Sequence, residues 1–192
     1  GALAIAAGPD YLAALVGTAT TVPGRACDRA GTSEGVNLCA ERGLDDPRLI
    51  SVPHIVEPYA NISGLISTTG AALAWWKRAL AEPGLARLDP APSGSYDELL
   101  DALSRVPAGA RGLVFLPYLS GERSPIWDPD ARGAFVGLSL AHGLPEMGRA
   151  VLESSAFAMR DVIEVMEEDG ASVAELRATG KPALSPLWNQ VK

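Results

Sequence analysis

Six residues, Ala30–Gly35, constrain the fold most, because small and hydroxyl-bearing residues stand directly before an alternating segment. Val36–Cys39 alternates in polarity with a period of two, which predicts a strand. Because the polar run Cys27–Arg29 comes just before, Gly31-Thr32-Ser33 is predicted to form a tight turn between two strands. Such a turn exposes backbone N–H groups and hydroxyls, which suits the binding of phosphate oxygens. Taken alone, these residues are more often a purely structural turn.

The composition is that of a globular protein with one hydrophobic core. The 192 residues are enough for one domain, and 47% hydrophobic and 20% charged residues are ordinary values. A net charge of −7 argues against nucleic acid or an anionic membrane as the main partner. No apolar run reaches membrane-spanning length and the first residues lack a basic leader, so we expect a cytoplasmic protein with reduced Cys27 and Cys39. His54 and His142 stand apart, and no metal cluster is predicted.

The start of the chain raises a question about Asp10. The apolar run Ala2–Ala7 predicts a buried strand, and Tyr11–Val16 predicts a helix that stops at Gly17. Asp10 between them is either the N-cap of that helix or a general base at the carboxyl end of a strand. Residue chemistry alone favours the cap, because Asp is a leading N-cap residue.

Further elements follow from periodicity and capping signals. Gly70 at the start of a helix is either a cap or a place where a phosphate approaches the helix N-terminus. The Gly180-Lys181 pair is not a P-loop, because Glu175 and Pro182 stand where that motif needs Gly and Ser or Thr. The predicted strands are Leu49–Val56, Ile62–Ile66, Gly112–Leu116 and Val173–Ala178. Helices are predicted from Thr68–Gly70 to about Glu82, after a Ser95–Glu98 capping box, from Pro145 to Gly170 and from Ser185-Pro186. The connections are a charged loop Glu41–Arg48, a linker Leu85–Gly94 and an irregular loop Pro117–Gly133 that is expected to hold internal salt bridges.

Taken together, these motifs resemble the C-terminal half of the FGGY carbohydrate kinases, and most of all the xylulokinase-like members. The resemblance covers nearly the whole chain and implies an α/β fold, a ribonuclease-H-like or actin-like ATPase domain with a mixed sheet flanked by helices. The residues that carry it are Gly8-Pro9-Asp10, Gly31-Thr32-Ser33, Gly70 with Trp75, Leu116–Pro125, Asp130–Gly133, and Thr179-Gly180 through Asn189-Gln190.

The resemblance also implies roles for single residues. Asp10 matches the catalytic base, which takes the proton of the sugar hydroxyl as it attacks the γ-phosphate of ATP. Gly31, Thr32 and Ser33 match the turn that contacts the nucleotide phosphates, and Gly70 matches a second phosphate contact. Gly180 and Lys181 match an adenosine-binding motif with Ser185 near the base, although the family usually has glycine where Lys181 stands. ATP and Mg²⁺ are the cofactors implied, and Thr32 and Gly70 are expected to face one cleft.

We therefore expect residues 1–192 to be the C-terminal domain of an FGGY-type kinase, without its N-terminal sugar-binding domain and without the end of the fold. The parent enzyme is expected to phosphorylate a sugar or polyol hydroxyl with ATP, as a phosphotransferase with an alcohol acceptor. The small-molecule sugar and the N-terminal domain are the expected partners, a homodimer is a further expectation, and this chain alone is expected to be inactive. The alternative is a non-catalytic nucleotide-binding or interaction domain that keeps the kinase fold.

Overall fold

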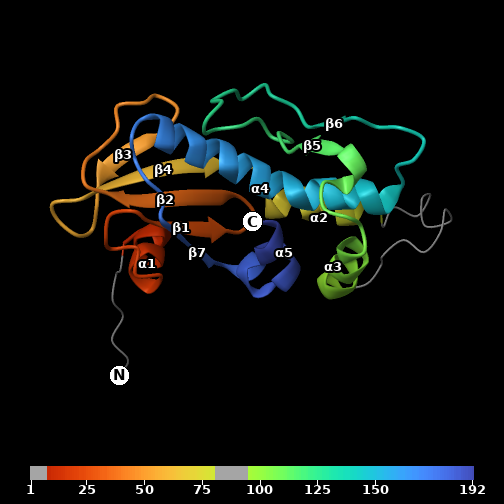
Figure 1. Ribbon diagram of the computed structural model, residues 1–192, viewed down its shortest axis with the longest axis horizontal. Coiled ribbons are helices and arrows are strands. Elements are labelled where there is room, and N and C mark those ends of the chain that lie inside the picture. The colour runs from red at the N-terminus through yellow and green to blue at the C-terminus, as the bar shows by residue number, and fades with distance from the viewer. Residues whose placement is uncertain (1–7, 81–94) are drawn as a thin grey trace.

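A mixed five-stranded sheet forms the centre of the chain (Figure 1). The structure is a computed structural model and describes residues 8–80 and 95–192, so the predicted strand at 2–7 and the linker at 85–94 lie outside the described residues. The strand order is β3-β4-β2-β1-β7, with antiparallel neighbours except for β7, which runs parallel to β1. The strands are β1 (Arg25–Ala30), β2 (Glu34–Ala40), β3 (Ile50–Pro53), β4 (Ala60–Ile66) and β7 (Glu175–Thr179). The mixed α/β class predicted from the sequence is confirmed.

Helices flank this sheet, and the longest of them, α4 (Leu144–Glu168), crosses one of its faces (Figure 1). A Cβ built on Gly64 of β4 would overlap the Val162 side chain of α4, so glycine allows the helix to pack close to the strand. The other helices are α1 (Asp10–Gly17), α2 (Gly70–Leu80), α3 (Tyr96–Ser104) and α5 (Pro186–Val191), with short 3₁₀ turns η1 (Ala110–Gly112) and η2 (Lys181–Leu184).

The core has two parts, and α4 contributes to both. One part lies between α4 and the sheet, where Val36, Leu38 and Ile62 are completely buried. The other joins α2, α3 and α5 to the first half of α4, with Leu73, Trp76 and Trp188 as large members. Alternate residues of a strand face opposite sides of a sheet. The Cys27 thiol contacts Thr18, which directly follows α1, so Cys27 faces away from α4. Both cysteines are buried free thiols, as predicted.

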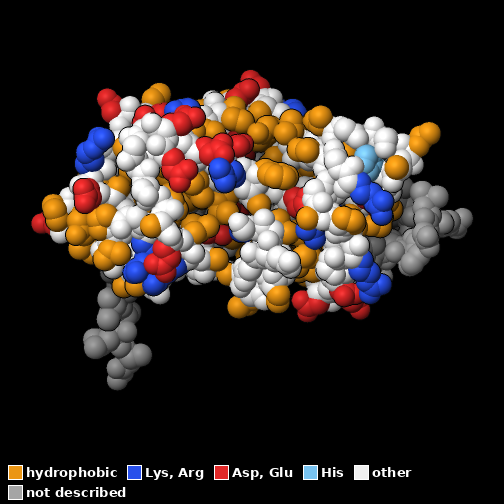
Figure 2. Space-filling model, viewed as in Figure 1, with side chains coloured by type: hydrophobic (Ala, Val, Ile, Leu, Met, Phe, Trp, Pro, Cys, Tyr) orange, Lys and Arg blue, Asp and Glu red, His pale blue; other side chains and the backbone are white. Residues whose placement is uncertain are grey.

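A two-stranded sheet of β5 (Val114–Leu116) and β6 (Ala134–Val136) lies beside α4. Strand β6 was not predicted, because it lies at the end of an irregular segment and depends on pairing with β5. The Phe115 and Phe135 rings meet across this pair with centroids 4.6 Å apart. Hydrophobic side chains are prominent on the face along which α4, β5 and β6 lie (Figure 2), and those of Val136, Leu138 and Phe157 are more than half exposed.

Two local predictions need comment, and the first of them was wrong. Pro9, with an extended backbone, is the N-cap of α1, whereas Asp10 is the first helical residue and makes no capping hydrogen bond. The loop Pro117–Gly133 holds the predicted internal salt bridge between Arg132 and Asp130, at 3.8 Å, whereas Glu122 and Arg123 form none with each other. Instead the buried Glu122 carboxylate accepts the backbone N–H groups of Ser67 at 2.6 Å and Arg123 at 2.8 Å. One oxygen of Glu122 is therefore held by two backbone donors, one from the β4–α2 junction and one from the loop itself.

Candidate functional site

The β1–β2 turn and the start of α2 are joined by a set of backbone hydrogen bonds. The Gly31 carbonyl accepts the N–H of Gly70 at 3.1 Å, and the Thr32 carbonyl accepts the N–H groups of Thr69 at 3.3 Å and Ala71 at 3.0 Å. A Cβ on Gly70 would overlap the Gly31 carbonyl oxygen, so this junction needs glycine. The prediction that Thr32 and Gly70 face one cleft is confirmed.

These bonds change the interpretation of Gly70. Its N–H already has a partner in the Gly31 carbonyl, so that group does not point to an unfilled ligand position. The turn differs in this respect. The N–H groups of Thr32 and Ser33 make no hydrogen bond to any described residue, and they remain available as donors. The open backbone donors at this junction therefore belong to the turn rather than to the helix start.

A third segment, Gly180–Ser185, reaches the same place from the end of β7. Gly180 has φ +92°, and a Cβ on it would overlap the Ala30 carbonyl oxygen, so glycine alone fits against the end of β1. Ser185 follows as the N-cap of α5 and accepts the N–H of Trp188 at 3.2 Å. The buried Trp188 indole in turn donates to Ser155 of α4 at 2.9 Å, which fixes α5 on the domain.

A cavity of about 890 Å³ opens where these three segments meet. Five of the predicted nucleotide-site residues line it, and they are Gly31, Thr32, Gly70, Lys181 and Ser185. Sequence reasoning missed the other side of this cavity, which α2 and α3 form through Arg78, Tyr96, Asp97 and Leu100. Charged, aromatic and aliphatic residues in a helix carry no local signal of binding, so the sequence alone does not distinguish these four from ordinary surface residues.

The remaining predicted site residues lie next to the cavity or away from it. Ser33 and Gly180 are neighbours of lining residues in the chain but do not line the cavity themselves. Asp10 is on α1 and is not a lining residue, and its side chain is 81% exposed. One carboxylate oxygen of Asp10 lies 3.3 Å from the guanidinium of Arg29, which is two residues before Gly31. The structure thus connects Asp10 to the turn through Arg29.

A buried charged cluster under the turn was also missed. The Lys192 ammonium lies 2.6 Å from the Asp28 carboxylate and 2.9 Å from the Glu34 carboxylate, and both acids are at most 1% exposed. Burial and, to a smaller extent, the Asp28 charge raise the pKa of Glu34 to about 7, against the opposing effect of Lys192. Glu34 directly follows Ser33, so this charged cluster lies next to the turn.

Two other properties bear on the chemistry. Among the described residues, no three or more His, Cys, Asp or Glu side chains are grouped in a way that could hold a metal ion. Within the same residues, none of the helices has the length and apolar character needed to cross a membrane.

Comparison with known proteins identifies the family to which the chain belongs. Residues 29–192 match the family model for the C-terminal domain of the FGGY family of carbohydrate kinases. The chain is 32% identical over 164 residues to the gluconokinase of Bacillus subtilis strain 168, a match that covers 84% of this chain and 32% of that protein. It is 33% identical over 190 residues to the glycerol kinase of Citrifermentans bemidjiense, covering 95% of this chain and 36% of the relative.

A solved structure agrees with these sequence matches. The xylulose kinase of Rhodospirillum rubrum has a TM-score of 0.79 and 33% identity, covering 94% of this chain and 35% of that one. The chain thus spans about a third of the length of each of these relatives.

Proposed function

The chain belongs to the FGGY family of carbohydrate kinases, and we propose that it is the nucleotide-binding part of an enzyme that phosphorylates a sugar or polyol hydroxyl with ATP. The observation that carries this proposal is the convergence of three segments, far apart in the sequence, on one cavity. The β1–β2 turn, the start of α2 and the segment from Gly180 to Ser185 meet there, held by two glycines that leave no room for a side chain.

The cavity has the groups that a nucleoside polyphosphate needs. The Thr32 and Ser33 N–H groups and the Thr32 hydroxyl would donate to phosphate oxygens, since small turn residues let the backbone approach a phosphate closely. Lys181 and Arg78 supply positive charge on the cavity wall. Tyr96 and Leu100 supply an aromatic and an aliphatic surface for the nucleoside, which suits the mixed polar and apolar lining of ligand sites.

ATP would supply the phosphoryl group, and the protein's own task in such a transfer is positioning and electrostatic stabilisation. We propose that Mg²⁺ accompanies the nucleotide and is coordinated by its phosphate oxygens. The cationic side chains of Lys181 and Arg78 would then balance the remaining phosphate charge.

Asp10 is our candidate for the general base. A base must reach the attacking hydroxyl, and the Asp10 carboxylate is exposed and is oriented by Arg29 on the strand that leads into the turn. In this role Asp10 accepts the hydroxyl proton while the oxygen attacks phosphorus. Its position outside the cavity is consistent with a sugar that lies beyond the phosphate end of the nucleotide.

The test is ATP-dependent phosphorylation by the full-length protein that contains this chain. Gluconate, xylulose and glycerol are suitable acceptors, because the names of the relatives give them as substrates. We expect ADP release that depends on at least one of them. If the protein binds Mg·ADP but phosphorylates none of a broad panel of sugars and polyols, the second candidate function applies. That candidate is a non-catalytic nucleotide-binding domain, for which the residues that line the cavity are sufficient.

A further inference from the structure

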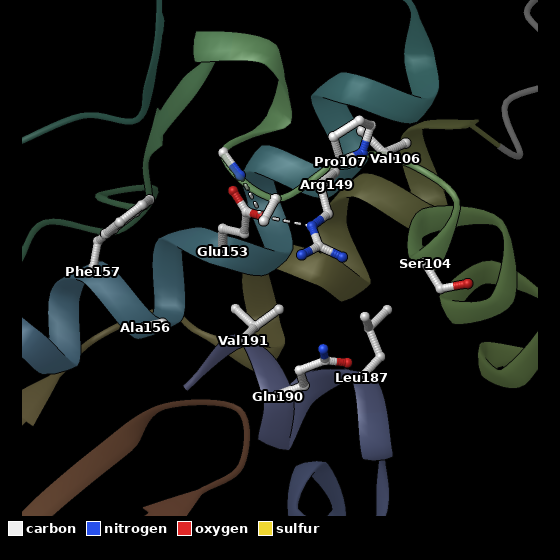
Figure 3. Close-up of a pocket in the computed structure, with 12 residues that line it drawn as sticks. Ser104, Val106, Pro107, Arg149, Glu153, Ala156, Phe157, Leu187, Gln190 and Val191 are labelled. Carbon is white, nitrogen blue, oxygen red and sulfur yellow. Dashed lines mark hydrogen bonds and ion pairs between the residues drawn. The ribbon is translucent and has the colours of Figure 1, made fainter.

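A second cavity, of about 460 Å³, lies between the end of α3, the first half of α4 and helix α5 (Figure 3). It shares no lining residue with the proposed nucleotide cavity, so the two are separate sites. Arg149 of α4 is the only cationic residue in its lining, and we call it the Arg149 cavity.

Arg149 is deeply buried but only partly hydrogen-bonded. Its side chain is 8% exposed, and its Nε donates to Glu153 Oε1 at 2.6 Å. The same Glu153 oxygen accepts the Gly109 N–H at 3.0 Å, and Arg149 Nη1 is 3.5 Å from the Leu103 carbonyl oxygen. A guanidinium has five N–H donors, so these two contacts of Arg149 leave three, including both on Nη2.

The unused donors of Arg149 face the cavity. Figure 3 shows both terminal nitrogens pointing toward Leu187 and Gln190 of α5, away from the Glu153 carboxylate. Glu153 contacts Nε through one oxygen only, and Leu103 takes one N–H of Nη1, so one N–H of Nη1 and both of Nη2 are left at the edge formed by the terminal nitrogens. That edge matches the two oxygens of a carboxylate, which it binds through two parallel hydrogen bonds.

The rest of the lining defines the size and polarity of a ligand. Val106, Leu187 and Val191 form an apolar wall, and the half-exposed Phe157 stands at the rim. Gln190 is an exposed polar residue at the same opening. A cavity of this volume accepts a small organic molecule, and its walls favour one with a short hydrocarbon body.

We propose that the Arg149 cavity binds a small organic monocarboxylate. Its two oxygens take the Nη1–Nη2 edge of Arg149, and its apolar body lies against Leu187 and Val191. Glu153 neutralises much of the Arg149 charge, so the ligand gains from paired hydrogen bonds and apolar burial more than from net charge. The affinity expected for a simple probe is therefore in the millimolar to high micromolar range.

The test is titration of the purified protein with 4-methylpentanoate, with 4-methylpentanamide as the uncharged probe of similar shape. We expect saturable binding of the acid and at least about 5-fold weaker binding of the amide, because charge-assisted hydrogen bonds are about twice as strong as neutral ones. Inorganic phosphate serves as a second competitor. Equal binding of acid and amide, or displacement of the acid by phosphate at the same concentration, would overturn the assignment.

Two variants locate the binding. Gln190→Glu changes an exposed residue without changing its shape and places a negative charge at the opening, so the acid should bind about 3- to 10-fold more weakly. Gln190→Met is the matched control and should keep the affinity within about twofold, since it adds no charge. Arg149→Lys keeps the positive charge but removes the open edge, and it should abolish binding if it folds. Unchanged affinity of Gln190→Glu would refute the site even where Arg149→Lys fails to fold.

Discussion

The Gly70 N–H donates to the Gly31 carbonyl across 3.1 Å, and a Cβ on Gly70 would overlap that same oxygen. One backbone contact therefore sets the distance between the β1–β2 turn and α2. The cavity proposed to hold the nucleotide lies directly beside this contact, with Gly31, Thr32 and Gly70 in its lining. A larger residue at Gly70 should therefore change the width of the site.

Gly70→Ala should separate the turn from α2. We expect it to lower the free energy of unfolding by about 1–3 kcal/mol, the usual cost of forcing an extra methyl group into a packed position, and to weaken Mg·ADP binding. Urea unfolding and calorimetric titration measure the two effects. Gly17→Ala is the control, because a Cβ there meets no atom within 4 Å. Wild-type stability and affinity in Gly70→Ala would show that the contact does not shape the site.

Asp10→Asn tests the proposed base. The Asp10 side chain is exposed and does not cap α1, so Asn should leave folding and nucleotide affinity unchanged. If Asp10 takes the hydroxyl proton, turnover by the full-length enzyme should fall by about 10²–10⁴-fold. Asp101→Asn is a matched control, since Asp101 is also exposed and also paired with an arginine, Arg105. Near-normal turnover of Asp10→Asn would remove Asp10 from the mechanism.

Lys181→Met tests the cation on the cavity wall. Lys181 is exposed, so screening by solvent limits its contribution, and we expect Mg·ADP to bind about 3- to 10-fold more weakly. Adenosine, which has no phosphate, should bind the variant and the wild type equally. Arg132→Met, which removes an exposed cation outside the cavity, should change neither affinity. Tighter ADP binding by Lys181→Met would mean that the lysine obstructs the nucleotide.

Glu34→Gln tests the buried cluster through pH. Burial raises the pKa of folded Glu34 to about 7, above the value near 4.5 of an unperturbed glutamate, so the folded state holds this proton more tightly than the unfolded state. The contribution of this proton to the free energy of unfolding is fully present below the pKa of Glu34 in the unfolded state. It is lost as the pH rises through the folded-state pKa of about 7. Gln does not titrate. Relative to that of Glu34→Gln, the free energy of unfolding of the wild type should therefore fall by roughly 1–3 kcal/mol between about pH 4.5 and 8.

Urea unfolding of both proteins at several pH values in this window measures the difference. Asp28→Asn is a useful companion, because removing the Asp28 charge should lower the pKa of Glu34 and shift the loss of stability to lower pH. A stability difference between wild type and Glu34→Gln that stays constant with pH would contradict the assignment.

The elements with local signals were predictable from the sequence. The capping box of Ser95 and Glu98 and the Ser185 cap appear in the structure as expected, because a cap depends on residues within one turn. The turn at Gly31 was predictable because a change of residue type coincided with a period of two. That it meets Gly70 was expected only from the resemblance to the kinases, since no local property of either segment specifies the other.

Features that depend on distant partners were not predictable. Lys192 and Asp28 are 164 residues apart and meet only because the tertiary fold brings the residue after α5 next to β1. The same holds for Glu122, whose partner at Ser67 lies 55 residues away. Asp10 illustrates a different limit, because Pro9 adopts the extended conformation of an N-cap and moves the helix start by one residue. The open edge of Arg149 likewise follows from the tertiary arrangement of α4 and α5.

The central claim is that the turn and the Gly180–Ser185 segment hold a nucleotide together, and amide NMR chemical shifts on addition of Mg·ADP test it most directly. We expect the largest shifts at the backbone amides of Thr32, Ser33 and Lys181, with smaller changes at Tyr96 across the cavity. The chemical shifts of the amides in β5 and β6 should not change. If Mg·ADP shifts no amide, or if the largest shifts fall on β5, β6 or the Arg149 cavity, the proposed nucleotide site is wrong.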